Sequence, residues 1–400
     1  MIKIRLMKSI FIFLLALSVQ PVQCQTMQGQ VKWKFHSNGK IVGSPVIESG
    51  LIYFGSVDSC IYALDQQSGN LKWQFRTNGE IRSDALVKNG ILYCYNSSGN
   101  LYALNPITGK LHWTFQTSGE KYYDTWDYYL SSPVYSQGTL FIGNGNGKLY
   151  ALNAYTGKQK WIFEAGGPIH GSATVDSNRV YIGSFNGNFY ALNTRSGKQV
   201  WKFKTVGDAY FPKGEVQKGA ALDHGVLYFG SRDYNIYAIN AQKGHGQWNM
   251  KEGGSWVIAT PTIYEGNIYF GTSDSHSFYC MGKEYGDVKW KIPLNMRVYG
   301  SASAKDSLIY FGCFNGKIYG ANYRTGAIEW IFQTDGSKAN YSSVYDENDH
   351  FKKGFTLYGT DTRRAEQTLL TLGSILCTPI IDNKIIFFGS TDGNFYAVTL

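Results

Sequence analysis

The chain has 400 residues and a formal net charge of +9, from 38 Lys and Arg against 29 Asp and Glu. Three of the basic residues lie in the first 24 positions, so the remainder carries a charge near +6, or 35 basic against 29 acidic side chains. Apart from the pairs Lys352-Lys353 and Arg363-Arg364 the basic residues are dispersed, which excludes a nucleic-acid-binding stripe.

Residues 1–24 have the pattern of an export signal. Three basic residues precede the apolar run IFIFLLAL, which is too short for a membrane span. Cleavage after Cys24 would leave Gln25 first; alternatively, Cys24 is the lipid-modified residue of a bacterial lipoprotein. The preceding Pro-Val-Gln fits a lipobox badly. We therefore expect a protein that is exported to the bacterial periplasm or cell envelope and is not transmembrane; a soluble form is favoured over one with a lipid anchor at Cys24, and the second alternative stays open.

Residues 25–400 consist of one repeated unit. Eight tryptophans recur at intervals of 40, 40, 48, 40, 47, 42 and 40 residues, namely Trp33, Trp73, Trp113, Trp161, Trp201, Trp248, Trp290 and Trp330. A unit of this length cannot bury its own apolar face, and a period of about 40 residues is typical of a four-stranded propeller blade. The sequence predicts a single all-β domain, a monomeric eight-bladed β-propeller of four-stranded antiparallel blades, with the tryptophans between adjacent blades.

Each copy contains four short strand-like runs separated by turn residues, as in residues 83–116. A Tyr-Ala-Leu run, as at 62–64, marks the third strand. A turn with Asp or Asn first and Gly last follows, as at 65–69, and then the tryptophan strand. The first strand is predicted to open with a motif rich in small residues, IVGSP at 41–45 and ILCTP at 375–379 among them, because eight innermost strands converge on the axis.

The two ends of the chain are predicted to share blade eight. The last copy stops at Leu400 within a third strand, whereas the first tryptophan strand, at 31–35, has no blade before it. Joining the two leaves no open sheet edge where the ring closes. Truncation of either end should therefore open the ring.

Departures from the 40-residue spacing occur at 117–130, 205–217 and 334–374. Each segment connects a tryptophan strand to the next first strand, so all three emerge on one face, where loops vary freely. Aromatic rings beside carboxylates suit a protein, peptide or sugar partner. The predicted partner-binding residues are Tyr122, Tyr123, Asp124, Trp126, Asp127, Tyr128, Tyr210 and Phe211. Alternatively, these rings only cover the end of a blade.

The longest insertion, 334–374, has a polar half followed by TRRAEQTLLTLGS. In this second half Ala365, Leu369 and Leu372 can share one face of a short helix. The segment is either a lid over the channel or a mobile flap, because forty residues without repeat character permit both.

Variable and charged residues of the first-strand motif are predicted to ring the mouth of the channel. The polar members of this ring come from blades two, four, five and seven. In addition, Asp84 and Lys218 are charged at positions where other copies have small or uncharged residues. The candidates for a ligand pocket are Arg82, Asp84, His170, Lys218, Trp256 and Tyr299. Alternatively, the charged members are ion pairs that line the channel.

No catalytic or metal-binding pattern is recognisable, so we assign no catalytic residue and no metal ligand. Seven histidines show no ligand spacing, and GNGNGK at 143–148 joins two strands without a following helix, which makes it a hairpin turn. No Gly-x-Ser-x-Gly elbow occurs. The five cysteines after residue 24 are expected to be small buried strand residues, with a Cys313–Cys377 disulfide as the one pairing considered.

The repeat resembles the pyrroloquinoline quinone (PQQ) repeat, most clearly in LYALNPITGKLHWTF and LYALNAYTGKQKWIF. The resemblance covers 30–400 apart from the insertions, and two classes of protein share it. Quinoprotein dehydrogenases hold PQQ and a calcium ion, and the resemblance to them implies a vicinal Cys-Cys pair that this chain lacks. Non-catalytic propellers similar to BamB, a periplasmic scaffold of outer-membrane β-barrel assembly, match the chain in length, single-propeller organisation and export signal.

We therefore expect a non-enzymatic exported scaffold that binds an envelope protein through its loop face, without a cofactor, and serves outer-membrane protein assembly. Two alternatives stay open. One is the binding of PQQ with calcium, or of another small ligand, at the polar mouth. The other is a sugar- or polymer-binding module, for which the aromatic and acidic loop is the support.

Overall fold

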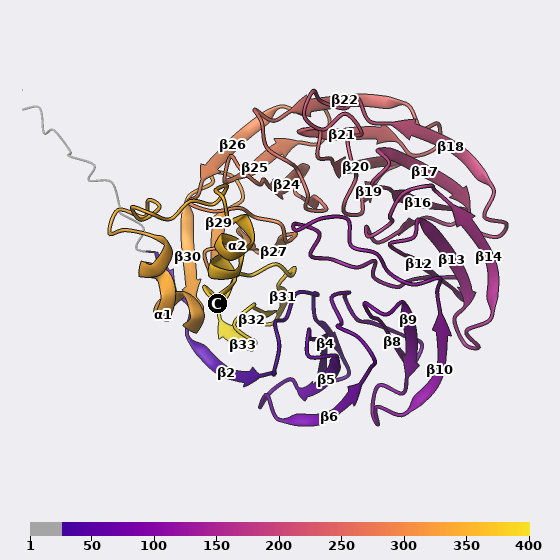
Figure 1. Ribbon diagram of the computed structural model, residues 1–400, viewed down its shortest axis with the longest axis horizontal. Helices are drawn as coiled ribbons and strands as arrows, with labels where there is room; N and C mark the ends of the chain where they lie inside the picture. Colours follow the sequence, from indigo (N-terminus) through magenta and orange to yellow (C-terminus); the bar gives the residue numbers. More distant parts are fainter. Residues whose placement is uncertain (1–25) are drawn as a thin grey trace, which may run out of the picture.

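The strand-like runs of each repeat pair as antiparallel hairpins, because turn residues reverse the chain between them. The computed structural model describes residues 26–400; the predicted export signal and the alternatives at Cys24 lie outside the described residues. Eight sheets surround a central axis, seven of four strands and one to which a fifth short strand is added, and in each blade the first strand is innermost and the tryptophan strand lies toward the outside (Figure 1). The predicted all-β, eight-bladed propeller is confirmed. Among residues 26–400, no helix is long and apolar enough to cross a membrane.

The first four blades follow the sequence in order. Blade one contains β3 (Val46–Glu48), β4 (Leu51–Gly55), β5 (Cys60–Asp65) and β6 (Leu71–Arg76), and blade two contains β7 (Leu86–Lys88), β8 (Ile91–Tyr95), β9 (Asn100–Leu104) and β10 (Leu111–Gln116). Blade three contains β11 (Val134–Ser136), β12 (Thr139–Gly143), β13 (Lys148–Asn153) and β14 (Gln159–Glu164), and blade four contains β15 (Thr174–Val175), β16 (Arg179–Gly183), β17 (Asn188–Asn193) and β18 (Gln199–Lys204).

The next three blades repeat this order, and the eighth is completed from the N-terminus. Blade five contains β19 (Ala221–Asp223), β20 (Val226–Gly230), β21 (Asn235–Asn240) and β22 (Gly246–Lys251), and blade six contains β23 (Thr262–Tyr264), β24 (Asn267–Gly271), β25 (Ser277–Gly282) and β26 (Val288–Pro293). Blade seven contains β27 (Ser303–Lys305), β28 (Leu308–Gly312), β29 (Lys317–Asn322) and β30 (Ile328–Gln333), and blade eight contains β31 (Ile380–Asp382), β32 (Ile385–Gly389), β33 (Asn394–Thr399) and β2 (Val31–His36).

The motif predicted to open each first strand instead precedes it. Residues 41–45 lie outside the sheet ladder, and besides packing on their own blade they contact the neighbouring blades. The backbone N–H of Ser44 donates to Oδ1 of Asp84 over 2.6 Å. A Cβ atom on Gly43 would lie 2.3 Å from the carbonyl oxygen of Ser83. Small residues are therefore required here by contact between adjacent blades.

Seven of the eight fourth-strand tryptophans pack on the turn between the third and fourth strands of the next blade. A Cβ atom on Gly69 would lie 2.5 Å from the ring of Trp33, and one on Gly109 would lie 2.7 Å from the ring of Trp73. The indole N–H of Trp33 also donates to the carbonyl of Gln66 over 3.2 Å. The turn glycine thus has two roles. It leaves room for the tryptophan ring, and it takes the positive φ that the turn requires, +72° at Gly69.

Closure of the ring follows the prediction and adds one strand to it. Strand β2 pairs antiparallel with β33, so the predicted sharing of blade eight by the two chain ends is confirmed. Strand β1 (Met27–Gln28) pairs parallel with β30 at the outer edge of blade seven. A Cβ atom on Gly29 would lie 2.3 Å from the ring of Trp330. Gly29 therefore takes the place that the turn glycine of the next blade has elsewhere.

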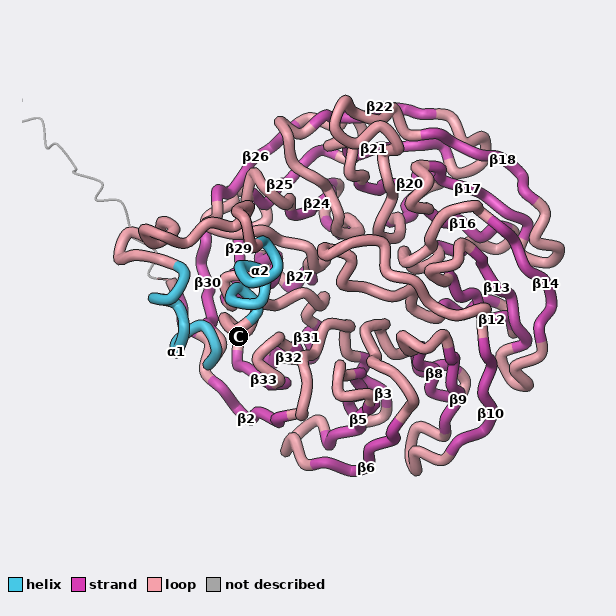
Figure 2. Tube along the Cα trace, in the orientation of Figure 1, coloured by secondary structure: helices cyan, strands magenta, loops and turns pink. Residues whose placement is uncertain are grey.

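The 334–374 insertion contains the two helices, α1 (Asp335–Val344) and α2 (Thr362–Leu370) (Figure 2). The side chain of Asp361 caps α2 by accepting from the backbone N–H of Arg364 over 3.0 Å. Ala365 and Leu369 are buried in the largest core cluster, together with Leu372 beyond the end of α2. Helix α2 and Leu372 are thus packed as a lid over the inner ends of the blades, whereas α1 lies beside β30 at the outer edge of the ring (Figure 1).

Candidate functional site at the channel mouth

The first insertion, 117–130, folds inward and reaches the centre of the ring, where its purple trace can be followed (Figure 1). Its own carboxylates hold its turn: the backbone N–H of Tyr123 donates to Asp127 Oδ2, and that of Trp126 donates to Asp124 Oδ1, each over 3.0 Å. The carboxylates between the aromatic residues therefore act first on the loop itself.

A buried charged cluster joins this loop to blade four. His170 Nδ1 lies 2.8 Å from Asp127 Oδ2, and His170 Nε2 lies 3.1 Å from Glu120 Oε2, with all three side chains at most 3% exposed. Burial lowers the pKa of His170, but the two carboxylates outweigh burial and raise the pKa to about 10. The ring is therefore an imidazolium at neutral pH, and both of its nitrogens donate.

A second cluster centres on Arg232, which is 2% exposed. Its Nε donates to Gln217 Oε1 over 2.9 Å, and its other nitrogens pair with the carboxylate of Asp124. The guanidinium lies 4.3 Å from the ring centre of Trp256, a cation–π distance. Gln217 in turn donates to the carbonyl of Trp126 over 3.0 Å. Blades five and six and the first insertion are thereby held together.

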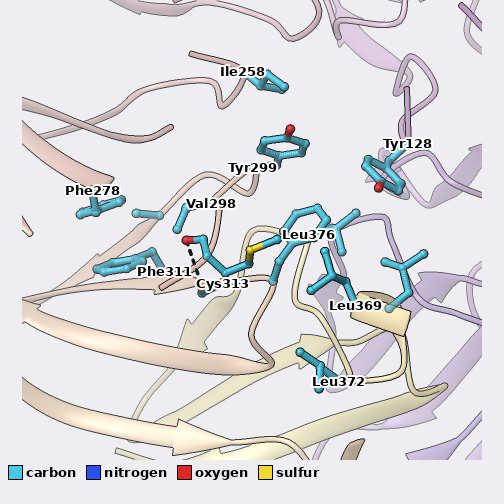
Figure 3. Packing of buried hydrophobic residues seen from close by; sticks show 14 of the residues in the cluster. Tyr128, Ile258, Phe278, Val298, Tyr299, Phe311, Cys313, Leu369, Leu372 and Leu376 are labelled. Carbon is cyan, nitrogen blue, oxygen red and sulfur yellow. Dashed lines mark hydrogen bonds between the residues drawn. The ribbon is translucent and has the colours of Figure 1, made fainter. Parts of the chain in front are cut away.

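The third cluster anchors α2 to the mouth. Arg297 Nη2 donates to Glu366 Oε2 over 3.2 Å, and the hydroxyl of Tyr128 donates to the same carboxyl group. Burial raises the pKa of Glu366, whereas Lys40 and the guanidinium of Arg297 favour its charged form. Leu369, Leu372 and Leu376 lie on one side of Tyr128 and Tyr299, and all five belong to the largest core cluster (Figure 3).

Deeper in the channel, Lys218 Nζ lies 3.4 Å from the ring centre of Tyr129. Burial lowers the pKa of Lys218, and Asp84 opposes this effect. The hydroxyl of Tyr129 donates to the carbonyl of Leu376 over 2.9 Å. Near the rim, Arg82 pairs with Glu80 at 2.6 Å. The six predicted mouth residues thus belong to separate clusters around the centre of the ring rather than to one pocket.

The predicted partner-binding residues differ in exposure. Tyr210 is 82% exposed and Tyr122 is 45% exposed, whereas Asp127 and Tyr128 are buried. Phe211 lies edge-on to Trp256, with ring centres 5.0 Å apart. The remaining members are partly buried, namely Tyr123, Asp124 and Trp126. Most of the loop therefore faces the channel, and a few rings face outward.

Sequence reasoning missed Arg232, Arg297 and Glu366. For Arg232 and Arg297 a signal was present, because each is a charged residue at a fixed position of the repeat. Arg232 is the second residue after the second strand of its blade; the other blades have uncharged residues there, namely Val57, Ser97, Gly145, Phe185, Ser273, Phe314 and Thr391. Arg297 directly precedes a first-strand motif, as do Lys40, Glu80, Tyr128, Glu215 and Trp256. Glu366 belongs to the 334–374 insertion, so no equivalent position in the other repeats could have indicated it.

A calcium ion beside a quinone requires several oxygen ligands that converge on one point. Among residues 26–400, no three His, Cys, Asp or Glu side chains converge as metal ligands. The cysteines Cys60, Cys94, Cys280, Cys313 and Cys377 are buried and free, so the Cys313–Cys377 pairing is wrong and no vicinal pair lies at the mouth. The face of Trp256 is covered by Arg232. These residues do not match the donor set of a quinone beside a calcium ion.

The fold and the repeat define the class of protein: an eight-bladed propeller built from PQQ-type repeats. The family model described as outer membrane protein assembly factor BamB matches residues 16–127, 125–249 and 211–400. Since these segments cover nearly the whole chain, the protein belongs to that family. Among curated proteins, none matches the chain significantly in sequence.

Similar solved structures come from both classes that share the repeat. BamB from Moraxella catarrhalis superimposes with a TM-score of 0.70 at 14% identity, covering 93% of this chain and 100% of that one. A europium-containing methanol dehydrogenase gives 0.66 at 13%, covering 93% of each chain. The quinohemoprotein alcohol dehydrogenase from Comamonas testosteroni gives 0.69 at 13%, covering 93% of this chain and 76% of that one. At such identities these likenesses show the fold alone.

Proposed function

We propose that this protein is a non-enzymatic exported scaffold that binds an envelope protein through its loop face in outer-membrane protein assembly. The observation that carries the proposal is a set of three exposed tyrosines, one from each insertion: Tyr122, Tyr210 and Tyr358, at 45%, 82% and 53% exposure. Tyrosine supplies a large contact area at low entropic cost and is enriched in binding surfaces. Membership of the family named for outer-membrane assembly supports the same function.

The buried clusters beneath these rings fit a scaffold better than a catalyst. His170, Arg232 and Arg297 are each paired with a carboxylate of an insertion. Such pairs hold the loop backbones in one arrangement before a partner arrives, which lowers the ordering cost of binding. Because these three side chains are at most 2% exposed, they offer no open surface on which to meet a substrate.

Site-specific photo-crosslinking in cells tests this proposal. A photoreactive amino acid is placed at Tyr122 or Tyr210, and as a matched control at Tyr285, which is 75% exposed in a turn on the opposite face. We expect crosslinks to an outer-membrane assembly protein from the first two positions and none from Tyr285. Equal crosslinking from all three positions, or none from any, contradicts a partner on the loop face.

The cofactor alternative needs its own measurement. Purified protein is titrated with PQQ in the presence of calcium, and absorbance and dye reduction are followed. We expect no saturable change and no dye reduction. Saturable binding accompanied by dye reduction would replace the scaffold proposal with an enzymatic function.

A further inference from the structure

A cavity of about 270 Å³ lies beneath α2, on the side of blades one and two, and none of the buried clusters fills it. Its floor is apolar and comes from Val42, Leu370 and Leu376, which are at most 9% exposed. The side chain of Tyr128 lines it as well. Pockets for drug-sized molecules measure roughly 300 to 1,000 Å³, so this one suits a smaller ligand.

The open end of the cavity carries cations. Lys40 and Arg363 line it and are exposed, and no carboxylate of residues 26–400 forms an ion pair with either. The third cation, Arg82, is paired with Glu80 at 2.6 Å. The remaining acid in the lining, Glu366, is held by Arg297. Neither positive charge at the entrance is therefore neutralised by a direct ion pair, although Glu80 and Glu366 act on Lys40 at longer range.

We propose that this cavity binds a small organic carboxylate with an apolar body. The body would lie on the apolar floor, where burial of each methylene contributes about 0.8 kcal/mol. The carboxylate would remain at the entrance, where Lys40 and Arg363 supply charge-assisted hydrogen bonds. This site goes beyond the proposed scaffold function and does not depend on it, because the exposed tyrosines of the loop face take no part in the cavity lining.

Calorimetric titration of the full exported chain with sodium octanoate tests the site, with octan-1-ol as the uncharged probe of similar length. We expect saturable binding of octanoate and much weaker binding of octan-1-ol. In Lys40→Met the apolar stem is kept and the charge is lost, so binding should weaken roughly tenfold, the loss of one charge-assisted hydrogen bond. Lys202→Met, an exposed lysine on the outer strand β18, is the matched control and should bind as the native chain does.

A second variant tests the cavity floor without changing any charge. Val57 lines the cavity, and Val57→Phe fills part of its volume. Binding of octanoate should be abolished while the unfolding temperature stays close to the native value. The proposal is overturned if octanoate does not bind, if octan-1-ol binds equally well, or if Lys40→Met or Val57→Phe binds like the native chain. Crosslinking at Tyr210 is read separately, so the two proposals can fail independently.

Discussion

At the scale of single residues, the channel mouth is notable because its buried charges are paired across different segments. Burying an unpaired charge costs several kcal/mol, whereas a paired and hydrogen-bonded charge can be tolerated. His170 and Arg297 are 0% exposed, and each meets a carboxylate brought by an insertion. Removing one partner should therefore cost more than the pair itself contributes.

His170 provides the sharpest case. His170→Gln leaves Asp127 and Glu120 buried without a cation, and the unfolding free energy at pH 7 should fall by about 3–5 kcal/mol. Because the pKa of His170 is raised to about 10 from 6.5, its stabilisation is complete below pH 6.5 and is lost as the pH rises through 10. Denaturant unfolding at pH 6, 8 and 9.5 measures the difference between native and variant chains, which should shrink toward alkaline pH.

The exposed His112 supplies the matched control for this experiment. His112→Gln should leave the unfolding free energy unchanged within about 0.5 kcal/mol at every pH. If the native chain and His170→Gln differ by the same amount at all three pH values, the imidazolium between two carboxylates is not the source of the stability.

Arg232 should not tolerate even a charge-conserving change. Arg232→Lys keeps the charge but loses the forked contacts to Gln217 and Asp124 and the stacking on Trp256. We expect a loss of about 2 kcal/mol in unfolding free energy, measured by denaturant titration. Arg324→Lys, in an exposed turn, should change the same quantity by less than about 0.5 kcal/mol. Equal effects would mean that the fork geometry is not used.

At the scale of elements, α2 is stabilised by its position rather than by its own propensity. A helix of nine residues is marginal in isolation, and most of its stability comes from packing. Its buried face meets residues from blades seven and eight and from the first insertion in the largest core cluster. The lid, the mouth and the first insertion are therefore expected to unfold together.

Leu369 tests this coupling. It is 0% exposed, so Leu369→Ala should lower the unfolding free energy by about 2–5 kcal/mol and raise hydrogen exchange in both α2 and residues 117–130. Leu111→Ala, at a position 48% exposed on β10, is the matched control with a small effect. Faster exchange confined to α2 would show that the lid opens alone.

At the scale of the whole molecule, stability depends on closure of the ring by strands from both ends. A chain beginning at Ser37 lacks β2 and leaves β33 as an open edge, so we expect it to aggregate. A chain beginning at Gln30 lacks only β1 and should remain a folded monomer with a lower unfolding temperature, because Trp330 loses its cover. Size-exclusion chromatography with light scattering and thermal unfolding compare the two truncations. A folded monomer lacking β2 would contradict this account of closure.

The sequence alone determined the fold. The tryptophan, the turn with Asx and Gly, and the third-strand Tyr-Ala-Leu recur within each unit of about 40 residues, so strand number, blade number and closure can be read locally. One local prediction was wrong: the motif at 41–45 precedes its strand, because its hydrogen bonds go to the neighbouring blade, which a single repeat does not reveal.

Only the tertiary structure decided the arrangement at the mouth. His170 meets Asp127 across 43 residues, Arg232 meets Asp124 across 108, and Arg297 meets Glu366 across 69. No repeat period relates these partners, since one member of each pair belongs to an insertion. A repeated pattern specifies contacts that every blade makes, whereas the pairing of unique charged groups depends on where irregular loops settle over the ring.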